Sequence, residues 1–148
     1  MKIATYPFVK RPESYYYEFY SEGPNGSIKK VVEYFKLDEW EAEVYNLAFG
    51  DWDEENNRIN DLSISNNADR EKILATVAAT VTDFMVNHSE AIIVAAGSTT
   101  SRTRLYQMGI AKVLHEIDQA FEIQGYTNNS WQPFQKGVNY SAFLLKTR

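Results

Sequence analysis

The sequence predicts an α+β fold in which two helices pack on one mainly antiparallel sheet. Residues 14–65 alternate between β-favouring segments and polar turns, which is typical of an antiparallel meander of about four strands. After residue 68 the apolar residues switch to helical spacing, and a strand, a second helix and a last strand follow. In this interpretation residues 1–148 form a single α+β domain.

The meander begins with a hairpin over residues 14–37. The turn sequence GPNGS separates an aromatic-rich first strand, 14–22, from a second strand, SIKKVVEYFKL. Side chains alternate between the two faces of the first strand. One face carries Tyr15, Tyr17 and Phe19, and the other carries Tyr16, Glu18 and Tyr20. A third strand over 42–50, the polar loop DWDEENN and a short fourth strand, RINDLSIS, complete the meander.

The first helix is predicted over residues 69–88. Its apolar residues recur at helical spacing: Ile73, Leu74, Val77, Ala78, Val81, Phe84 and Met85. Asn66 or Asn67 can cap its start, and Asp69 and Glu71 suit the positive end of the helix dipole.

The C-terminal half contains three further predicted elements. The short apolar segment AIIVAA, residues 91–96, predicts a buried strand with both faces covered. A second helix follows over about residues 100–122. We expect GYTNNSWQPFQKG to be an irregular loop and NYSAFLLK to be the last strand.

Composition limits the classes of function. Hydrophobic residues make up 44% of the chain and aromatic residues 14%, as in a globular protein. The absence of cysteine excludes disulfides, cysteine-ligated zinc and thiol catalysis, and is compatible with the cytoplasm. The net charge of −5 disfavours nucleic acid as a partner. We expect no signal peptide and no membrane span, because the longest apolar run is AIIVAA.

The stretch GSTTSRTRLYQ predicts an anion site where a buried strand runs into a helix. A helix start presents free backbone N–H groups and partial positive charge, which phosphate or carboxylate groups bind readily. Hydroxyl groups and a nearby guanidinium add hydrogen-bond donors. The candidate ligand-binding residues are Gly97, Ser98, Thr99, Thr100, Arg102, Arg104 and Tyr106. The alternative is an ordinary cap, with arginines in structural ion pairs.

The two arginines differ in their predicted positions on the helix. Arg102 falls at the edge of the apolar face, one turn before Tyr106, and can line a pocket at the end of the sheet. Arg104 falls nearly opposite the centre of that face and points to solvent or a partner. The stretch is not a Walker loop, a GxGxxG motif or a nucleophile elbow.

The acidic segment that begins at Asp51 and Asp53 is a weak candidate for binding Mg²⁺ or Ca²⁺. The EF-hand pattern fails, because Asn56 stands where glycine is needed and Leu62 where glutamate is needed. A solvated loop is the simpler interpretation, and the carboxylates can also pair with the arginines.

Aromatic residues offer two more candidate surfaces. Outward-facing tyrosines of the first hairpin can stack on bases or form a homodimer interface, and the net charge favours the interface. Trp131 and Phe134 form either a lid over a pocket or a hydrophobic plug.

Four blocks carry a resemblance to a known family: YEFYSEGPNGSIKKVVEY, YNLAFGDWD, SNNADREKILATVA and GSTTSRTRLYQM. They span roughly residues 14–115, and the chain resembles an uncharacterised family of small bacterial proteins, a domain of unknown function. The resemblance implies a bacterial, soluble, single-domain protein. It supplies no activity and no catalytic residue to carry over, and the cofactor is left open.

Three functions remain open at this point. The first is a cytoplasmic binding or regulatory protein that recognises a phosphate-bearing ligand or a protein partner through residues 97–106. The second is an enzyme, a toxin-like nuclease or a transferase, that acts on a nucleotide, coenzyme A or nucleic acid. It would use Asp51 and Asp53 with the two arginines in one cleft. The third is a toxin–antitoxin or phage-conflict protein that acts by protein contact alone.

Overall fold

The computed structural model describes residues 4–11, 15–38, 41–60, 67–96, 99–117 and 121–147, without the side chains of Arg102, Leu105 and residues 112–117. The described residues form nine strands and two helices. In chain order these are β1 (Val9–Arg11), β2 (Tyr16–Gly23), β3 (Gly26–Lys36), β4 (Val44–Asp53), β5 (Arg58–Asn60), α1 (Arg70–Val86), β6 (Ile92–Ala95), α2 (Thr100–Ile117), β7 (Phe121–Thr127), β8 (Ser130–Pro133) and β9 (Ala142–Thr147).

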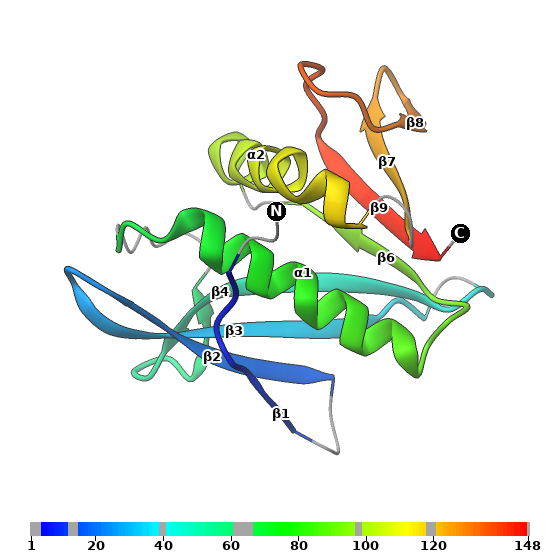
Figure 1. The fold of residues 1–148 in the computed structure, drawn as a ribbon. Coiled ribbons are helices and arrows are strands. Elements are labelled where there is room, and N and C mark those ends of the chain that lie inside the picture. The colour runs from blue at the N-terminus through cyan, green and yellow to red at the C-terminus, as the bar shows by residue number, and fades with distance from the viewer. Residues whose placement is uncertain are drawn as a thin grey trace.

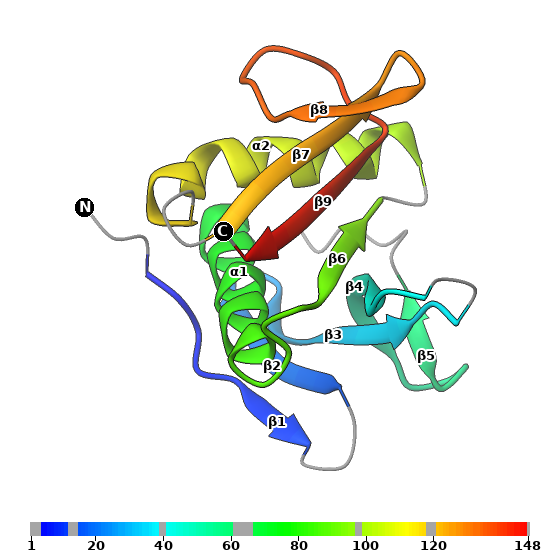
Figure 2. The same cartoon turned by 90° about the vertical axis from the view of Figure 1, so that its right-hand side faces the viewer.

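One sheet contains all of these strands. Its order is β1-β2-β3-β4-β6-β9-β7-β8, and β5 pairs with β4 off this path. Strands β4 and β6 are parallel, and the other described pairs are antiparallel. Figures 1 and 2 show both helices on the same face of this twisted sheet. The mainly antiparallel α+β architecture is therefore confirmed, although the sheet has more strands than the predicted meander and its two single strands.

The predicted first hairpin is confirmed as β2 and β3. Gly23 pairs with Gly26 across the turn, and Gly26 has a φ of 89°, which favours glycine. Tyr17 and Phe19 are buried under the helices, whereas Tyr20 on the opposite face is 50% exposed. Strand β4 runs on to Asp53, so the start of the predicted polar loop is in fact strand.

Helix α1 packs its aromatic end on β3. The Phe84 ring stacks on Tyr34, with centroids 4.3 Å apart, and on His88, with centroids 4.2 Å apart. The Tyr34 hydroxyl also hydrogen-bonds the buried Thr80 hydroxyl at 2.9 Å. Burial and this polar contact together fix the position of the helix on the sheet.

The predicted cap of α1 is wrong for Asn67. Asp69 is the N-cap residue, and Asn66 lies outside the described residues. The Asn67 side chain is used by the first hairpin instead: its Nδ2 donates to Gly26 O at 2.9 Å, and its Oδ1 accepts from Asn25 N at 2.7 Å. Because both the oxygen and the nitrogen of the Asn67 amide bond the β2–β3 turn, neither atom is left to cap α1.

The C-terminal half departs most from expectation. Residues 125–133 belong to a β7–β8 hairpin, so the predicted irregular loop is wrong there. Asn128 and Asn129 have φ values of 51° and 63°, which suits a tight two-residue turn. The second helix is described as far as Ile117 and cannot reach residue 122, because Phe121 starts β7 and pairs with Thr147.

The two helices cover only one face of strand β6 (Figure 1). Ile93 is fully buried, but Ile92 and Val94 point to the other face and are half-buried. The predicted coverage of both faces is therefore wrong, because both helices lie on the same face of the sheet (Figure 1).

Candidate functional site

Helix α2 starts where the sequence predicts. Its first turn is closed by Thr103, whose backbone N–H and hydroxyl both donate to Thr99 O at 3.0 Å. Thr99 and Thr100 are exposed. Gly97 and Ser98 lie outside the described residues, as does the Arg102 side chain, so their predicted contact with an anion stays a prediction.

Tyr106, one of the candidate ligand-binding residues, lies under the start of α2. Its half-buried ring packs against Phe49 of β4, with centroids 6.4 Å apart, and its hydroxyl donates to Phe49 O at 3.5 Å. This residue anchors α2 to the sheet and supports the neighbouring turn rather than facing solvent.

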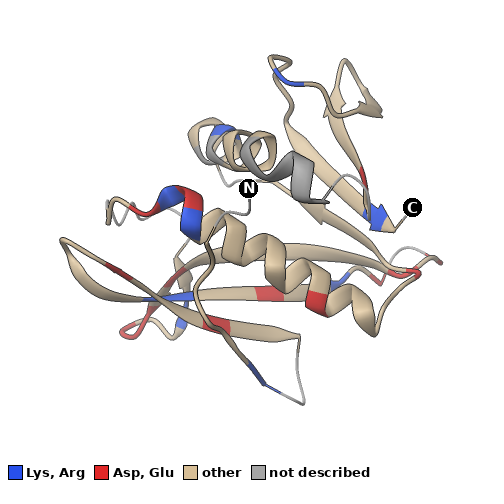
Figure 3. Ribbon diagram, in the orientation of Figure 1, with Lys and Arg blue, Asp and Glu red and all other residues tan. Residues whose placement is uncertain are grey.

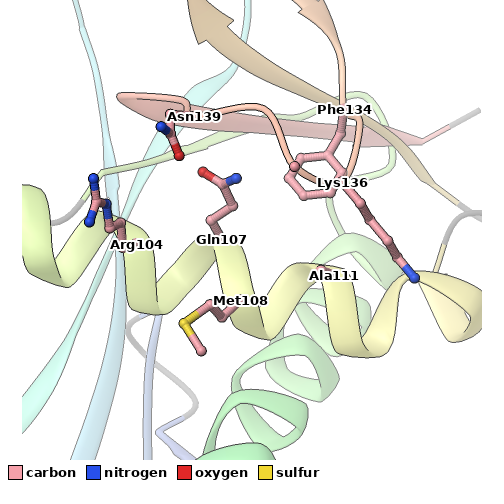
Figure 4. A pocket seen from close by; sticks show the side chains of 8 residues that line it. Arg104, Gln107, Met108, Ala111, Phe134, Lys136 and Asn139 are labelled. Atoms are coloured by element: carbon pink, nitrogen blue, oxygen red, sulfur yellow. The ribbon is translucent and has the colours of Figure 1, made fainter.

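Arg104 is exposed on the side of α2 that faces away from the core, and it lines a cleft. Residues three, four and seven positions apart on a helix share one face. In α2 that face forms one wall of the cleft, and the loop after β8 forms the other. The lining residues are Arg104, Gln107, Met108, Ala111, Phe134, Lys136, Gly137 and Asn139. The cavity volume is about 480 Å³, within the range of small-molecule sites (Figure 4).

Gln107 holds this loop against α2 with both ends of its amide. Its Nε2 donates to Val138 O, and its Oε1 accepts from Tyr140 N at 3.2 Å. The Tyr140 hydroxyl in turn accepts from Gln135 N at 2.9 Å. The loop that carries Lys136 is thus fixed at both of its ends relative to the helix.

The cleft is positively charged. Arg104 and Lys136 have no ion-pair partner among the described residues, and the lining contains no carboxylate. Figure 3 shows basic but no acidic residues on the described part of α2 and on the loop beside it. With the exposed amide of Asn139, these cations can bind a phosphate or carboxylate group by charge-assisted hydrogen bonds.

Phe134 is a hydrophobic plug rather than a lid. It packs partly buried against the core and contacts the rings of Tyr140 and Phe143. Trp131 lies on β8, 39% exposed, against Tyr126. Of these two aromatic residues, Phe134 lines the cleft and Trp131 does not. The Phe134 ring gives the cleft an apolar surface.

The two candidate metal ligands, Asp51 and Asp53, already have partners within the described fold. Asp51 forms an ion pair with the buried Lys30 on the helix-covered face. Asp53 accepts hydrogen bonds from Asn56 and from Glu55 N in the β4–β5 turn, and the bonds from Asn56 lower the pKa of Asp53 below its usual value. No group of three metal-ligating side chains occurs among the described residues. Neither aspartate lines the cleft that contains Arg104.

A buried polar cluster, missed by sequence reasoning, joins three segments. The Asp69 carboxylate accepts from the Tyr6 hydroxyl and the Ser21 hydroxyl, both at 2.5 Å. Burial raises the pKa of Tyr6, and the bond to Asp69 raises it further. Because the cluster ties the N-terminal segment and β2 to the start of α1, we interpret it as structural.

The outer face of the first strands combines aromatic and charged residues. The Lys29 ammonium lies 5.4 Å from the Trp52 ring centroid and 2.9 Å from a carboxylate oxygen of Glu18. Arg11 lies over the Tyr16 ring at 5.1 Å. Both signs of charge occur on this face, and its predicted use as a dimer interface stays a prediction.

The loop residues Lys136 and Asn139 were also missed by sequence reasoning. The segment around them reads only as irregular, and the one local signal is Gly137, whose φ of 86° reverses the chain between them.

Comparison with known proteins gives a family. The model of a family of unknown function, DUF6934, matches residues 2–148. The chain belongs to this family. The expected membership of a family of unknown function is confirmed, and the match covers nearly the whole length of the DUF6934 chain. No curated protein and no solved structure matches the chain. No described helix of this DUF6934 protein is long and apolar enough to cross a membrane.

Proposed function

We propose that this DUF6934 protein is a binding protein for a phosphate-bearing small molecule, which it holds in the cleft between α2 and residues 134–139. One observation carries the proposal: Arg104 and Lys136, exposed and without ion-pair partners in the described chain, line the same cavity of about 480 Å³. The first turns of α2 adjoin the Arg104 end. The predicted donors Thr99 and Thr100 are exposed there and can add contacts.

Binding is favoured over catalysis by the chemistry of the lining. Among the side chains that the structure describes, those lining the cleft include no carboxylate and no imidazole, which are the usual general bases. We propose that the protein works in the cytoplasm, because the chain contains no cysteine and so forms no disulfide that an oxidising compartment would favour. Action by protein contact remains the alternative, and the outer sheet face would then be the surface to test.

The first experiment is native mass spectrometry of the protein purified at low salt, followed by calorimetric titration with phenyl phosphate. We expect Arg104→Ala to remove any co-purified ligand and to weaken phenyl phosphate binding by about tenfold, because a hydrogen-bonded charge is lost. Arg70→Ala is the matched control: it removes an exposed arginine that lies on α1, outside the cleft. Equal binding by the wild type and Arg104→Ala would contradict the proposed site.

A further inference from the structure

The cleft has a positive group at each end. Figure 4 shows Arg104 and the Lys136 ammonium at opposite ends of the row of lining side chains, with Gln107 between them. Arg104 and Ala111 both line the cleft and lie seven residues apart in α2, which corresponds to about 10 Å along the helix axis. This wall of the cleft is therefore longer than one phosphate group.

The two ends are unequal. Asn139 lies at the Arg104 end (Figure 4), so an anion there meets a planar guanidinium and an amide. A guanidinium can bind two oxygens of a phosphate at once. At the other end the Lys136 ammonium acts as a single point charge beside Gly137. The Arg104 end is thus the stronger anion subsite.

The surface between the ends is largely apolar. Met108, Ala111 and Phe134 line it, and Met108 is 50% exposed. The polar side chain in this part, Gln107, already uses its amide to hold Val138 and Tyr140. A hydrocarbon or ring portion of a ligand can cover this surface without leaving polar groups unpaired.

From this arrangement we infer that the ligand is an elongated small molecule with an anionic group at each end, at least one of them a phosphate, and an apolar middle. The inference rests on the proposed function, because it concerns the same cleft. A ligand with one anionic group would leave one of the two cations unpaired, whereas a ligand with an anionic group at each end can pair with both (Figure 4).

A series of alkane-α,ω-bisphosphonates of increasing length tests the inference, with the alkyl monophosphonate of each length as its control. Binding is measured by calorimetry at low ionic strength, because exposed charges are screened by salt. We expect a bisphosphonate whose ends span about 10 Å to bind most tightly. Its advantage over the matched monophosphonate is expected to be about fivefold, the upper value for an exposed ion pair.

Two variants assign the ends. Lys136→Ala is expected to abolish the advantage of the bisphosphonate and to leave monophosphonate binding unchanged, while Arg104→Ala weakens both. Lys36→Ala, which removes an exposed lysine outside the cleft, is expected to change neither.

The outcomes separate the two claims. If monophosphonates bind through Arg104 but bisphosphonates show no optimum length and no dependence on Lys136, the two-ended ligand is wrong and the proposed function stands. If no phosphonate binds, both are wrong. If an acidic peptide binds through both cations more tightly than every bisphosphonate, the small-molecule ligand is wrong and a protein partner takes its place.

Discussion

The replacement of Gly125 by alanine tests how the cleft loop is built. Gly125 lies in β7, and the Tyr140 ring packs directly on it. A Cβ atom at this position would overlap Cγ and Cδ1 of that ring. The ring cannot simply swing away, because its hydroxyl accepts from Gln135 N and the Tyr140 backbone N–H donates to Gln107. Gly125→Ala must therefore displace the loop.

The expected cost follows from two opposing effects. Alanine in the interior of a strand is normally more favourable than glycine by roughly 0.5–1 kcal/mol. Overpacking against a fixed ring costs about 1–3 kcal/mol. We expect Gly125→Ala to lower the free energy of unfolding by about 1–2 kcal/mol, which for a chain of this size lowers Tm by about 3–8 °C. Chemical and thermal unfolding followed by circular dichroism measure both quantities.

The sign of the change in the free energy of unfolding shows whether the Tyr140 ring constrains the loop. If Gly125→Ala is neutral or stabilising, the Tyr140 ring does not constrain the loop as the structure shows. The matched control is the same substitution in a Tyr140→Ala background, where the overlap is removed and only the strand preference remains. There we expect alanine at position 125 to be neutral or stabilising.

Two further perturbations test the core. Burial raises the pKa of Tyr45 to about 12 and raises the pKa values of Tyr17 and Tyr34 as well, whereas tyrosines of the unfolded chain ionise near pH 10. Above about pH 10 the unfolded state binds fewer protons than the folded state, so the free energy of unfolding should fall as pH rises. Urea unfolding at neutral and alkaline pH measures this change. A free energy of unfolding that does not vary with pH in this range would contradict the burial of these hydroxyls. Lys30→Met removes one partner of a buried ion pair and is expected to lower stability by about 3 kcal/mol, with a smaller loss when Asp51 is also replaced by leucine, as measured by denaturant unfolding.

Local patterns predict the N-terminal half of the fold well. Alternation correctly separates Tyr17 and Phe19 from Tyr20 in β2, because one face of the hairpin is covered by helices and the other is not. The spacing of apolar residues likewise predicts α1, of which Ile73, Val81 and Phe84 are buried. In both elements a local period coincides with a real difference in burial.

In the C-terminal half the sequence correctly predicts β6, the start of α2 and the last strand, β9. The β7–β8 hairpin and the cleft could not be predicted in this way, because local patterns do not mark them. The β7–β8 turn uses two asparagines at positive φ rather than the glycine that normally marks such turns. The cleft needs Gln107 of α2 to meet Val138 and Tyr140 of the loop, and no local pattern encodes that pairing. The sequence therefore included Arg104 among the candidates, although it favoured Arg102 for lining a pocket, and it missed Lys136 and Asn139, which share the cleft of Arg104.

The rotation of α2 about its axis explains why Arg104 lies in the cleft. Tyr106 contacts Phe49 of the sheet, and Gly109 faces α1 so closely that a Cβ atom would overlap Leu74. At 100° per residue, Arg104 falls on the side opposite these two contacts. The sequence correctly placed it away from the core but could not show that the chain returns to that side. The contacts of Tyr106 and Gly109 set this rotation. We therefore expect Gly109→Ala to weaken anion binding at Arg104, although Gly109 does not line the cleft. Unchanged binding would show that α2 can move away from Leu74 without moving Arg104.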